Sequence, residues 1–350
     1  MTGDSTRAVR AGLPEPEALA PFLPGPVFAA PVHLPGDADP AGYGRFTNPT
    51  WEGLERAVGE LEGGDAVVFA SGMAAVTAVL MTGVASGEAV VVPGDAYPGV
   101  REVARQHLAP RGVEVRPVAS DEAAVREALR GARLVWVETP SNPGLHVFDV
   151  AALARDVQAA GAVLVADTTL ATPLRAPALA AGADVVVASA SKYLTGHGDL
   201  VLGYAATADA ERAAALRAWR TLTGSIPGPF EAWLAHRSLA TLGVRLERQE
   251  GNARALAGLL QARDDVADVR WPGVGSMLLF DLASADRAQA FLATCRLVDE
   301  ATSFGGVHSS AERRARWGTD DVGPGVLRFS CGIEDAGDLL ADVRDALDAV

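Results

Sequence analysis

The stretch Val185-Val186-Val187-Ala188-Ser189-Ala190-Ser191-Lys192-Tyr193 joins a short apolar run to a lysine. The apolar run is typical of a buried strand. Lys192 is the only lysine in 350 residues, and every other long-chain cation is an arginine. Unlike a guanidinium, an amine can lose its proton near neutral pH and form a Schiff base with a carbonyl. A lone surface lysine would fit the composition equally well, but the position after a buried strand predicts a functional site.

The composition excludes several classes of protein. With 49% hydrophobic and 21% charged residues, the chain has the composition of a globular protein, and 350 residues suffice for two domains. The net charge of −14 argues against nucleic acid or an anionic membrane as a partner. We find no signal peptide, no apolar run that would span a membrane, and no Cys/His cluster with metal-ligand spacing. We therefore expect a cytoplasmic protein with free cysteines and no metal site.

Short apolar runs alternate with helix-like runs through the first two thirds of the chain. The expected strands are 67–70, 89–92, 113–115, 134–138, 162–166 and 185–189, and the expected helices are 51–62, 73–81, 100–108, 121–129, 150–160 and 176–181. All-apolar strands separated by helices are typical of a parallel sheet that is covered on both faces. The sequence therefore predicts an α/β fold with a mostly parallel sheet.

The pattern of the chain changes near residues 45 and 225. Residues 1–45 are rich in proline, but they carry several large apolar residues that are not typical of disorder, and together these features predict an arm laid over another surface. Residues 46–225 hold the alternating pattern of the large domain. Residues 226–350 predict a smaller α+β domain, with helices at 230–242, 246–263 and 285–294, strands at 276–282 and 326–331, and a terminal amphipathic helix.

Ligands of parallel sheets bind beyond the carboxyl ends of the strands. Asp167 lies at such an end, 25 residues before Lys192. A buried carboxylate can hold a proton on the ring nitrogen of pyridoxal phosphate, which makes the ring an electron sink, while an amine forms the Schiff base. Asp167 alone would fit a helix cap, but the pair with Lys192 favours this cofactor.

Other strand-end residues supply donors that a phosphate needs. The backbone of Ser71-Gly72-Met73 opens a buried helix and presents N–H groups with the positive end of the helix dipole. Ser189 and Ser191 add hydroxyls, and Arg45 is a candidate for a bidentate cation. These residues together predict a phosphate site.

Three residues are candidates for contacts with the ring and the substrate. The aromatic face of Tyr97 suits stacking on the ring, and the amide of Asn142 suits a contact with a ring oxygen. Strand alternation places Arg328 on the face opposite Leu327 and Phe329. There it is suited to clamp a carboxylate, although an ordinary edge-strand arginine fits as well.

Taken together, these motifs resemble the pyridoxal-phosphate-dependent family of Cys/Met metabolism, the transsulfuration enzymes of cystathionine γ-lyase and γ-synthase type. The resemblance runs nearly end to end and is carried by Tyr43-Gly44-Arg45, Leu61-Glu62-Gly63-Gly64, Ser71-Gly72-Met73, Glu138-Thr139-Pro140-Ser141-Asn142-Pro143, Asp167-Thr168-Thr169, Ser189-Ala190-Ser191-Lys192 and Gly332-Ile333-Glu334-Asp335. It implies the aspartate-aminotransferase type of fold, with pyridoxal 5'-phosphate bound to Lys192 as a Schiff base.

The resemblance also implies roles for individual residues. The cofactor would be bound by Ser71, Gly72, Met73, Tyr97, Asn142, Asp167, Thr169, Ser189, Ser191 and Lys192. The substrate would be bound by Arg328, Asn142, Ser303 and His308. Tyr43 and Arg45 would reach the phosphate of a neighbouring subunit, which implies a homodimer or homotetramer with shared active sites.

The implied activity is γ-elimination on cystathionine or a related sulfur amino acid, with Lys192 as base and Tyr97 assisting the leaving group. The alternatives are γ-replacement on an O-acylhomoserine, a secondary-metabolic relative with another γ-substituted amino acid, and a catalytically silent protein that binds the cofactor. The chain has Pro98-Gly99-Val100 where the family commonly has Gly-Gly-Thr, and no cysteine near Tyr97, which argues against a methionine γ-lyase. His308 stands where the family often has glutamate, so we expect its loop, 303–310, to set specificity.

Overall fold

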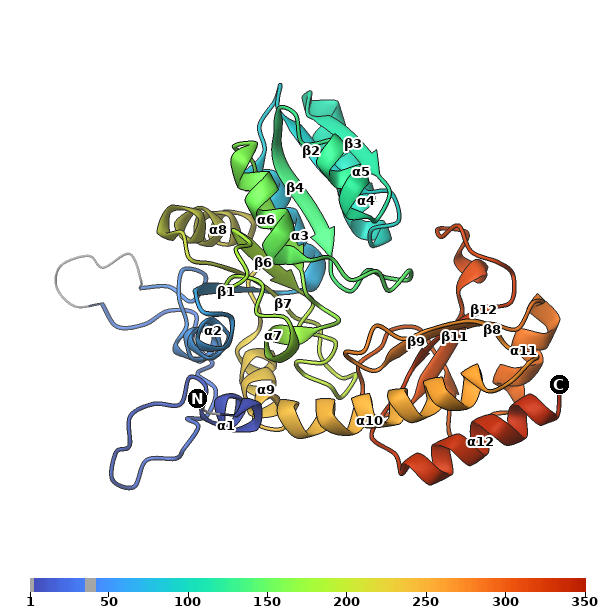
Figure 1. Cartoon of the computed structure of the whole chain (residues 1–350). Coiled ribbons are helices and arrows are strands. Elements are labelled where there is room, and N and C mark those ends of the chain that lie inside the picture. Colours follow the sequence, from blue (N-terminus) through green and yellow to red (C-terminus); the bar gives the residue numbers. More distant parts are fainter. Residues whose placement is uncertain (1–2, 35–41) are drawn as a thin grey trace.

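The computed structural model describes residues 3–34 and 42–350 (Figure 1). Its larger sheet is formed by seven strands between residues 65 and 207. The strands of this sheet are β1 Asp65–Phe69, β2 Ala89–Pro93, β3 Glu114–Val118, β4 Ala132–Glu138, β5 Val163–Asp167, β6 Val185–Ala188 and β7 Gly203–Thr207. They lie in the order β1-β7-β6-β5-β4-β2-β3. All neighbouring pairs are parallel except those that β7 makes with β1 and β6. The predicted α/β fold with a mostly parallel sheet is confirmed.

The sequence did not predict β7, which is the antiparallel strand of this sheet. Its Gly203-Tyr204-Ala205-Ala206-Thr207 sequence is too short and too rich in small residues to stand out as an apolar run. A Cβ atom at Gly203 would collide with the backbone of Ser71 and Gly72. The missing side chain therefore lets β7 pass close to the turn at Ser71 and Gly72 that follows β1.

Helices cover both faces of this sheet because its strands are apolar on both sides. Val67 and Phe69 of β1 belong to the core on one face, and Ala66 and Val68 belong to the core on the other. The covering helices are α2 Pro49–Glu62, α3 Gly72–Gly83, α4 Pro98–Val103, α5 Glu122–Glu127, α6 Val150–Ala159, α7 Thr172–Arg175 and α8 Ala210–Thr223. A π-helical turn over Ala104–Leu108 continues α4.

The helix expected at 176–181 is wrong. α7 ends at Arg175, and Ala176 has an extended φ of −133°. Pro177 follows it, and a proline disfavours helical backbone at the residue before it. The run of alanines after Pro177 therefore forms a turn instead of a helix.

The smaller sheet has the order β10-β11-β12-β9-β8 and lies beside the first. Its strands are β8 Ala267–Arg270, β9 Met277–Asp281, β10 Asp299–Glu300, β11 Ser310–Arg313 and β12 Val326–Ser330, and the helices of this half are α9 Pro229–Leu239, α10 Leu242–Gln261, α11 Ala285–Thr294 and α12 Ala336–Asp348. The long helix α10 runs from below the larger sheet to the smaller one (Figure 1). Leu327 and Phe329 of β12 pack into the core under this sheet, as the alternation predicted.

The predicted domain boundary at residues 225 and 226 falls between α8 and α9. Ala232 and Ala235 of α9, with Leu242 at the start of α10, belong to the same buried cluster as the larger sheet. The first part of the segment 226–350 thus packs with the large domain, and the boundary stays a prediction.

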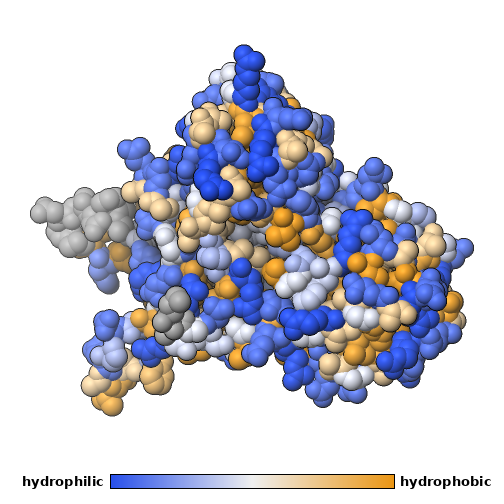
Figure 2. Space-filling view, viewed as in Figure 1, coloured by the Kyte–Doolittle hydropathy of each residue, from blue (hydrophilic) through white to orange (hydrophobic). Residues whose placement is uncertain are grey.

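The N-terminal segment first packs against the rest of its own chain and then continues as an exposed loop. Helix α1, Asp4–Arg10, is held there because the Arg7 guanidinium donates to the carbonyl of Leu61 over 2.9 Å. The loop after α1 exposes Phe22 and Phe28, and its tip is hydrophobic at the lower left of Figure 2. Residues 1–2 and 35–41 of the predicted arm lie outside the described residues. The contact of this arm with a neighbouring subunit stays a prediction.

Candidate active site

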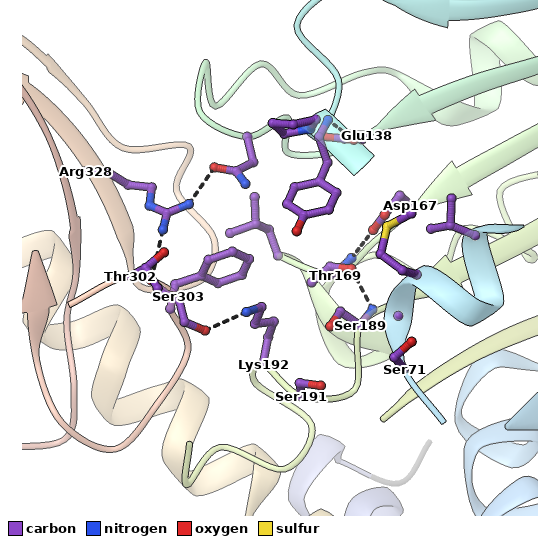
Figure 3. A pocket seen from close by; sticks show the side chains of 18 of the residues that line it. Ser71, Glu138, Asp167, Thr169, Ser189, Ser191, Lys192, Thr302, Ser303 and Arg328 are labelled. Carbon is purple, nitrogen blue, oxygen red and sulfur yellow. Dashed lines mark hydrogen bonds between the residues drawn. The ribbon is translucent and has the colours of Figure 1, made fainter. Parts of the chain in front are cut away.

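The carboxyl ends of β1, β2, β4, β5 and β6 meet at a cavity of about 530 Å³, which segments of the smaller sheet close from the other side (Figure 3). The predicted residues that line it are Ser71, Gly72, Met73, Tyr97, Asn142, Asp167, Thr169, Ser189, Ser191, Lys192, Ser303 and Arg328. These residues span more than 250 positions of the sequence. The fold therefore brings together residues that were selected by three separate arguments: the strand ends, the strand alternation and the family resemblance.

Lys192 lies between the two sheets. Its Nζ donates to the Ser303 hydroxyl over 2.5 Å and lies 5.2 Å from the centre of the Phe304 ring. Burial, with a smaller effect of the Arg328 cation, lowers the pKa of Lys192 to about 8. The neutral amine, which nucleophilic attack requires, is therefore more abundant near physiological pH than it is in a free lysine.

Asp167 ends β5 and faces the cavity (Figure 3). Its Oδ1 accepts from the backbone N–H of Thr169 over 2.9 Å, and the Thr169 hydroxyl in turn accepts from the N–H of Ser189. Burial raises the pKa of Asp167 to about 6, and the bonds from Thr169 oppose that rise. A cationic ring nitrogen beside Asp167 would favour the carboxylate again.

Glu138 is a second carboxyl group at the cavity; the sequence analysis included it in a family motif but gave it no role. The register of β4 and β5 places it opposite Asp167. It accepts from the N–H of Tyr97 over 2.6 Å, so it fixes the backbone that carries the tyrosine. Burial, and then the nearby Asp167, raise the pKa of Glu138 well above its ordinary value. Its place at a strand end is the signal that could have identified it.

The predicted phosphate site lies at the turn between β1 and α3, and its role stays a prediction. The Ser71 hydroxyl caps α3 by accepting from the N–H of Ala74 over 3.0 Å. A Cβ atom at Gly72 would lie 2.8 Å from the Cβ of Ser189, so only glycine allows these two loops to approach so closely. The Ser191 hydroxyl is already bonded to the backbone of Leu202 as donor and acceptor. The site nevertheless combines the N-terminus of a twelve-residue helix with hydroxyl groups.

Arg328 closes the cavity from the smaller sheet (Figure 3). Its guanidinium donates to the Asn142 side-chain oxygen over 3.0 Å and to the carbonyl of Ser303 over 3.1 Å. It also forms an ion pair with Glu312, which lies opposite it in the register of β11 and β12. Burial lowers the pKa of Arg328 to about 10, so it stays a cation at neutral pH.

Three of the predicted residues do not line the cavity of this chain. His308 is exposed, and the predicted specificity loop reaches the cavity with Ser303 and Phe304 instead. Arg45 donates to the carbonyl of Thr221 over 2.9 Å, and Tyr43 is exposed. The contact of Arg45 and Tyr43 with a second subunit stays a prediction.

The sequence analysis missed the residues that the smaller sheet adds. Phe304, Arg314 and Trp317 line the cavity, and Glu312 supports Arg328 from behind. Phe304 lies in the expected glycine-rich loop, 303–310, whereas the other three residues lie in or directly after β11, a strand that the sequence pattern did not predict. Polar residues on a short strand without apolar alternation gave no signal.

The cavity fits pyridoxal phosphate. It offers an amine with a lowered pKa at Lys192, a carboxyl group at Asp167, and a helix N-terminus at Gly72.

Within 3–34 and 42–350, no group of His, Cys, Asp and Glu residues is arranged to hold a metal ion. In the same ranges no helix has the length and apolarity to cross a membrane.

Comparisons with known proteins agree with this geometry. Residues 30–348 match the model of the family described as "Cys/Met metabolism PLP-dependent enzyme". The chain is 50% identical to a "Putative cystathionine gamma-lyase" of Streptomyces coelicolor, over 99% of this chain and 94% of the relative. It is 37% identical to a cystathionine gamma-lyase of Bacillus subtilis, over 88% and 89%. The structure of cystathionine gamma synthase from Xanthomonas oryzae pv. oryzae superposes with a TM-score of 0.92 and 32% identity, over 99% of this chain and 98% of the other.

Proposed function

We propose that this chain, which belongs to the Cys/Met metabolism PLP-dependent enzyme family, catalyses γ-elimination on cystathionine or a related sulfur amino acid. Relatives named as lyases and as synthases both match it, so the family alone gives the reaction type only as γ-elimination or γ-replacement. The 50% identity to the Streptomyces coelicolor protein favours elimination.

The residues of the cavity divide the work of such a reaction. Pyridoxal phosphate supplies a ring that withdraws electrons from the Cα of an attached amino acid. Asp167 would hold a proton on the ring nitrogen, and Ser71, Gly72 and Ser189 would hold the phosphate. Lys192 would bind the cofactor and, when its amine is free, would move protons at Cα and Cβ. Tyr97 would assist departure of the γ substituent, and Arg328 would orient the substrate carboxylate.

One observation carries this proposal. The Lys192 amine, whose pKa is lowered to about 8, lies in one cavity with the buried Asp167 carboxyl group and the Arg328 guanidinium. An amino acid bound there would meet a base, a partner for the cofactor ring and a clamp for its carboxylate. Proton transfer by a base placed in this way accelerates such steps by about 10²- to 10⁴-fold.

Two incubations of the purified holoenzyme test the proposal. With cystathionine, we expect ammonia, 2-oxobutanoate and cysteine. With an O-acylhomoserine and cysteine, we expect no net formation of cystathionine. Formation of cystathionine in the second incubation and no 2-oxobutanoate in the first would replace elimination by γ-replacement.

His308 and the loop around it allow a test of specificity. If His308 limits the use of cystathionine, His308→Glu raises kcat/KM for cystathionine relative to that for a smaller γ-substituted substrate. An unchanged ratio would remove His308 from the account of specificity. Ser303→Ala is the matched comparison, because Ser303 belongs to the same loop and does line the cavity.

We further propose that the active sites are shared between subunits of a homodimer or homotetramer. The exposed apolar residues after α1 and the position of Arg45 away from its own cavity support this arrangement. Mixing the variants Lys192→Ala and Arg45→Ala after dissociation and reassembly would then restore one intact site per hybrid pair. No recovery of activity, with hybrids demonstrated by mass, would contradict shared sites.

A further inference from the structure

We propose that Arg314 is a positioning residue that keeps the Arg328 clamp available for the substrate carboxylate. Arg314 lines the cavity but is not itself a free cation for the substrate, since its guanidinium is bonded to Glu312 and Asp320. The inference rests on the proposed role of Arg328 at the same site. It adds to that role the reason why a buried carboxylate next to the clamp does not neutralise it.

Glu312 is the residue that would otherwise neutralise Arg328. It is 1% exposed and forms an ion pair with Arg328. A carboxylate at this place competes with the carboxylate of the substrate, because both accept from the same guanidinium. The Arg328 donors are also shared with Asn142 and the carbonyl of Ser303, which leaves few of them for a ligand.

Arg314 competes with Arg328 for the carboxylate of Glu312. Its Nη1 donates over 2.6 Å to Oε1 of Glu312, the same oxygen that pairs with Arg328. The second oxygen, Oε2, accepts from the indole N–H of Trp317 over 2.9 Å. An oxygen shared by two guanidinium groups neutralises each of them only in part, so Arg328 keeps an attraction for an anion in the cavity.

The same network reaches the opposite rim of the cavity. Asp320 accepts from Nε of Arg314 over 3.0 Å and lies 3.8 Å from the guanidinium of Arg101. Arg101, in α4, also donates to the carbonyl of Thr319 over 2.9 Å and to that of Ala96, next to Tyr97, over 2.8 Å. The clamp is thereby linked to the segment that carries Tyr97, and Arg314 is the middle member of this link.

The charges give predictions of opposite sign for two neighbours. Arg328, Glu312, Arg314 and Asp320 together carry no net charge. Arg314→Gln leaves the group with a net negative charge and Glu312 with Arg328 as its main partner, so carboxylate binding weakens. Glu312→Gln leaves a net positive charge, and its amide oxygen can still occupy the place of Oε1. The double variant is neutral again.

Binding of two probes to the holoenzyme tests the inference. L-Norvaline carries a carboxylate and no γ leaving group, and butylamine is the same chain without the carboxylate. Their dissociation constants, measured by the absorbance of the bound cofactor, isolate the carboxylate contribution without turnover. We expect Arg314→Gln to weaken norvaline about tenfold and leave butylamine unchanged, because only the carboxylate meets the clamp.

The other variants decide between positioning and mere structural support. Glu312→Gln should bind norvaline at least as tightly as the wild type, and the double variant should recover most of the lost affinity. Equal weakening of both probes by Arg314→Gln, or weaker norvaline binding by Glu312→Gln, would overturn the inference. If Arg314→Gln does not fold, the sign of the Glu312→Gln effect decides alone.

Two controls separate this inference from the functions on which it rests. Arg316→Gln alters an exposed arginine on the same turn, bonded to Glu300, and should change neither probe. Arg328→Met should abolish the preference for norvaline; if it does not, the clamp role itself fails. Absence of 2-oxobutanoate from cystathionine with normal norvaline binding would instead refute the proposed elimination alone.

Discussion

The two walls of the cavity treat charge in different ways. On the wall from the larger sheet, Asp167 and Lys192 are half-buried and form no ion pair with each other, and their partial removal from water moves the pKa of each toward neutral pH. On the wall from the smaller sheet, Arg328 and Arg314 are paired with Glu312 and Asp320. The first wall is suited to moving protons, and the second is suited to holding a fixed ion in place.

Replacing Lys192 should have the largest effect of any substitution on the wall from the larger sheet. Lys192→Arg keeps a cation but removes the amine that can lose its proton and form a Schiff base. We expect turnover to fall about 10⁴-fold or more, because a nucleophile and a base are lost together. Turnover within tenfold of the wild type would refute the division between the two walls. The absorbance of the bound cofactor shows whether a covalent attachment survives.

Asp167→Asn tests a second group on the same wall whose pKa is shifted. We expect kcat to fall about 10²- to 10³-fold, since a preorganised charge at the ring nitrogen is lost while the shape of the side chain is kept. The matched control is Asp184→Asn, at the residue just before β6, where the carboxylate accepts from the N–H of Leu164 outside the cavity. If both variants lost activity equally, the effect of Asp167 would be one of folding and not of chemistry.

Much of the first wall could be predicted from the sequence, and little of the second. Buried parallel strands are continuous apolar runs, so the positions of Asp167 and Lys192 at their ends are visible in the sequence. Glu312 lies on β11, a four-residue strand with little apolar alternation, and Arg314 begins the 3-10 helix directly after it. Their meaning arises from the register that sets Glu312 opposite Arg328, which is a tertiary contact. β7 was missed for a similar reason, because small residues next to a close turn carry no periodic signal.

Arg328→Met tests the wall that binds. We expect KM for the amino-acid substrate to rise about 100-fold, with a smaller effect on kcat, because a buried charge pair with the substrate carboxylate is worth roughly 2–5 kcal/mol. The KM of Arg328→Lys should lie between those of the wild type and of Arg328→Met, since an ammonium keeps the charge and loses the planar fork of the guanidinium. A fall in kcat with an unchanged KM would instead assign Arg328 to the chemical step.

The pH dependence of cofactor uptake measures how the charges of one wall, Arg328 and Glu312, change the pKa of Lys192 on the other. The pKa of Lys192 is lowered to about 8, so its neutral form appears at lower pH than for a free lysine. The rate at which apoenzyme takes up pyridoxal phosphate should therefore rise with pH and level off above about 8. Arg328 lowers this pKa and Glu312 raises it, so Arg328→Met should move the midpoint up and Glu312→Gln should move it down. Differences between variants cancel the titration of the cofactor itself. Midpoints that coincide in all three proteins would show that the charges of the smaller sheet do not reach Lys192.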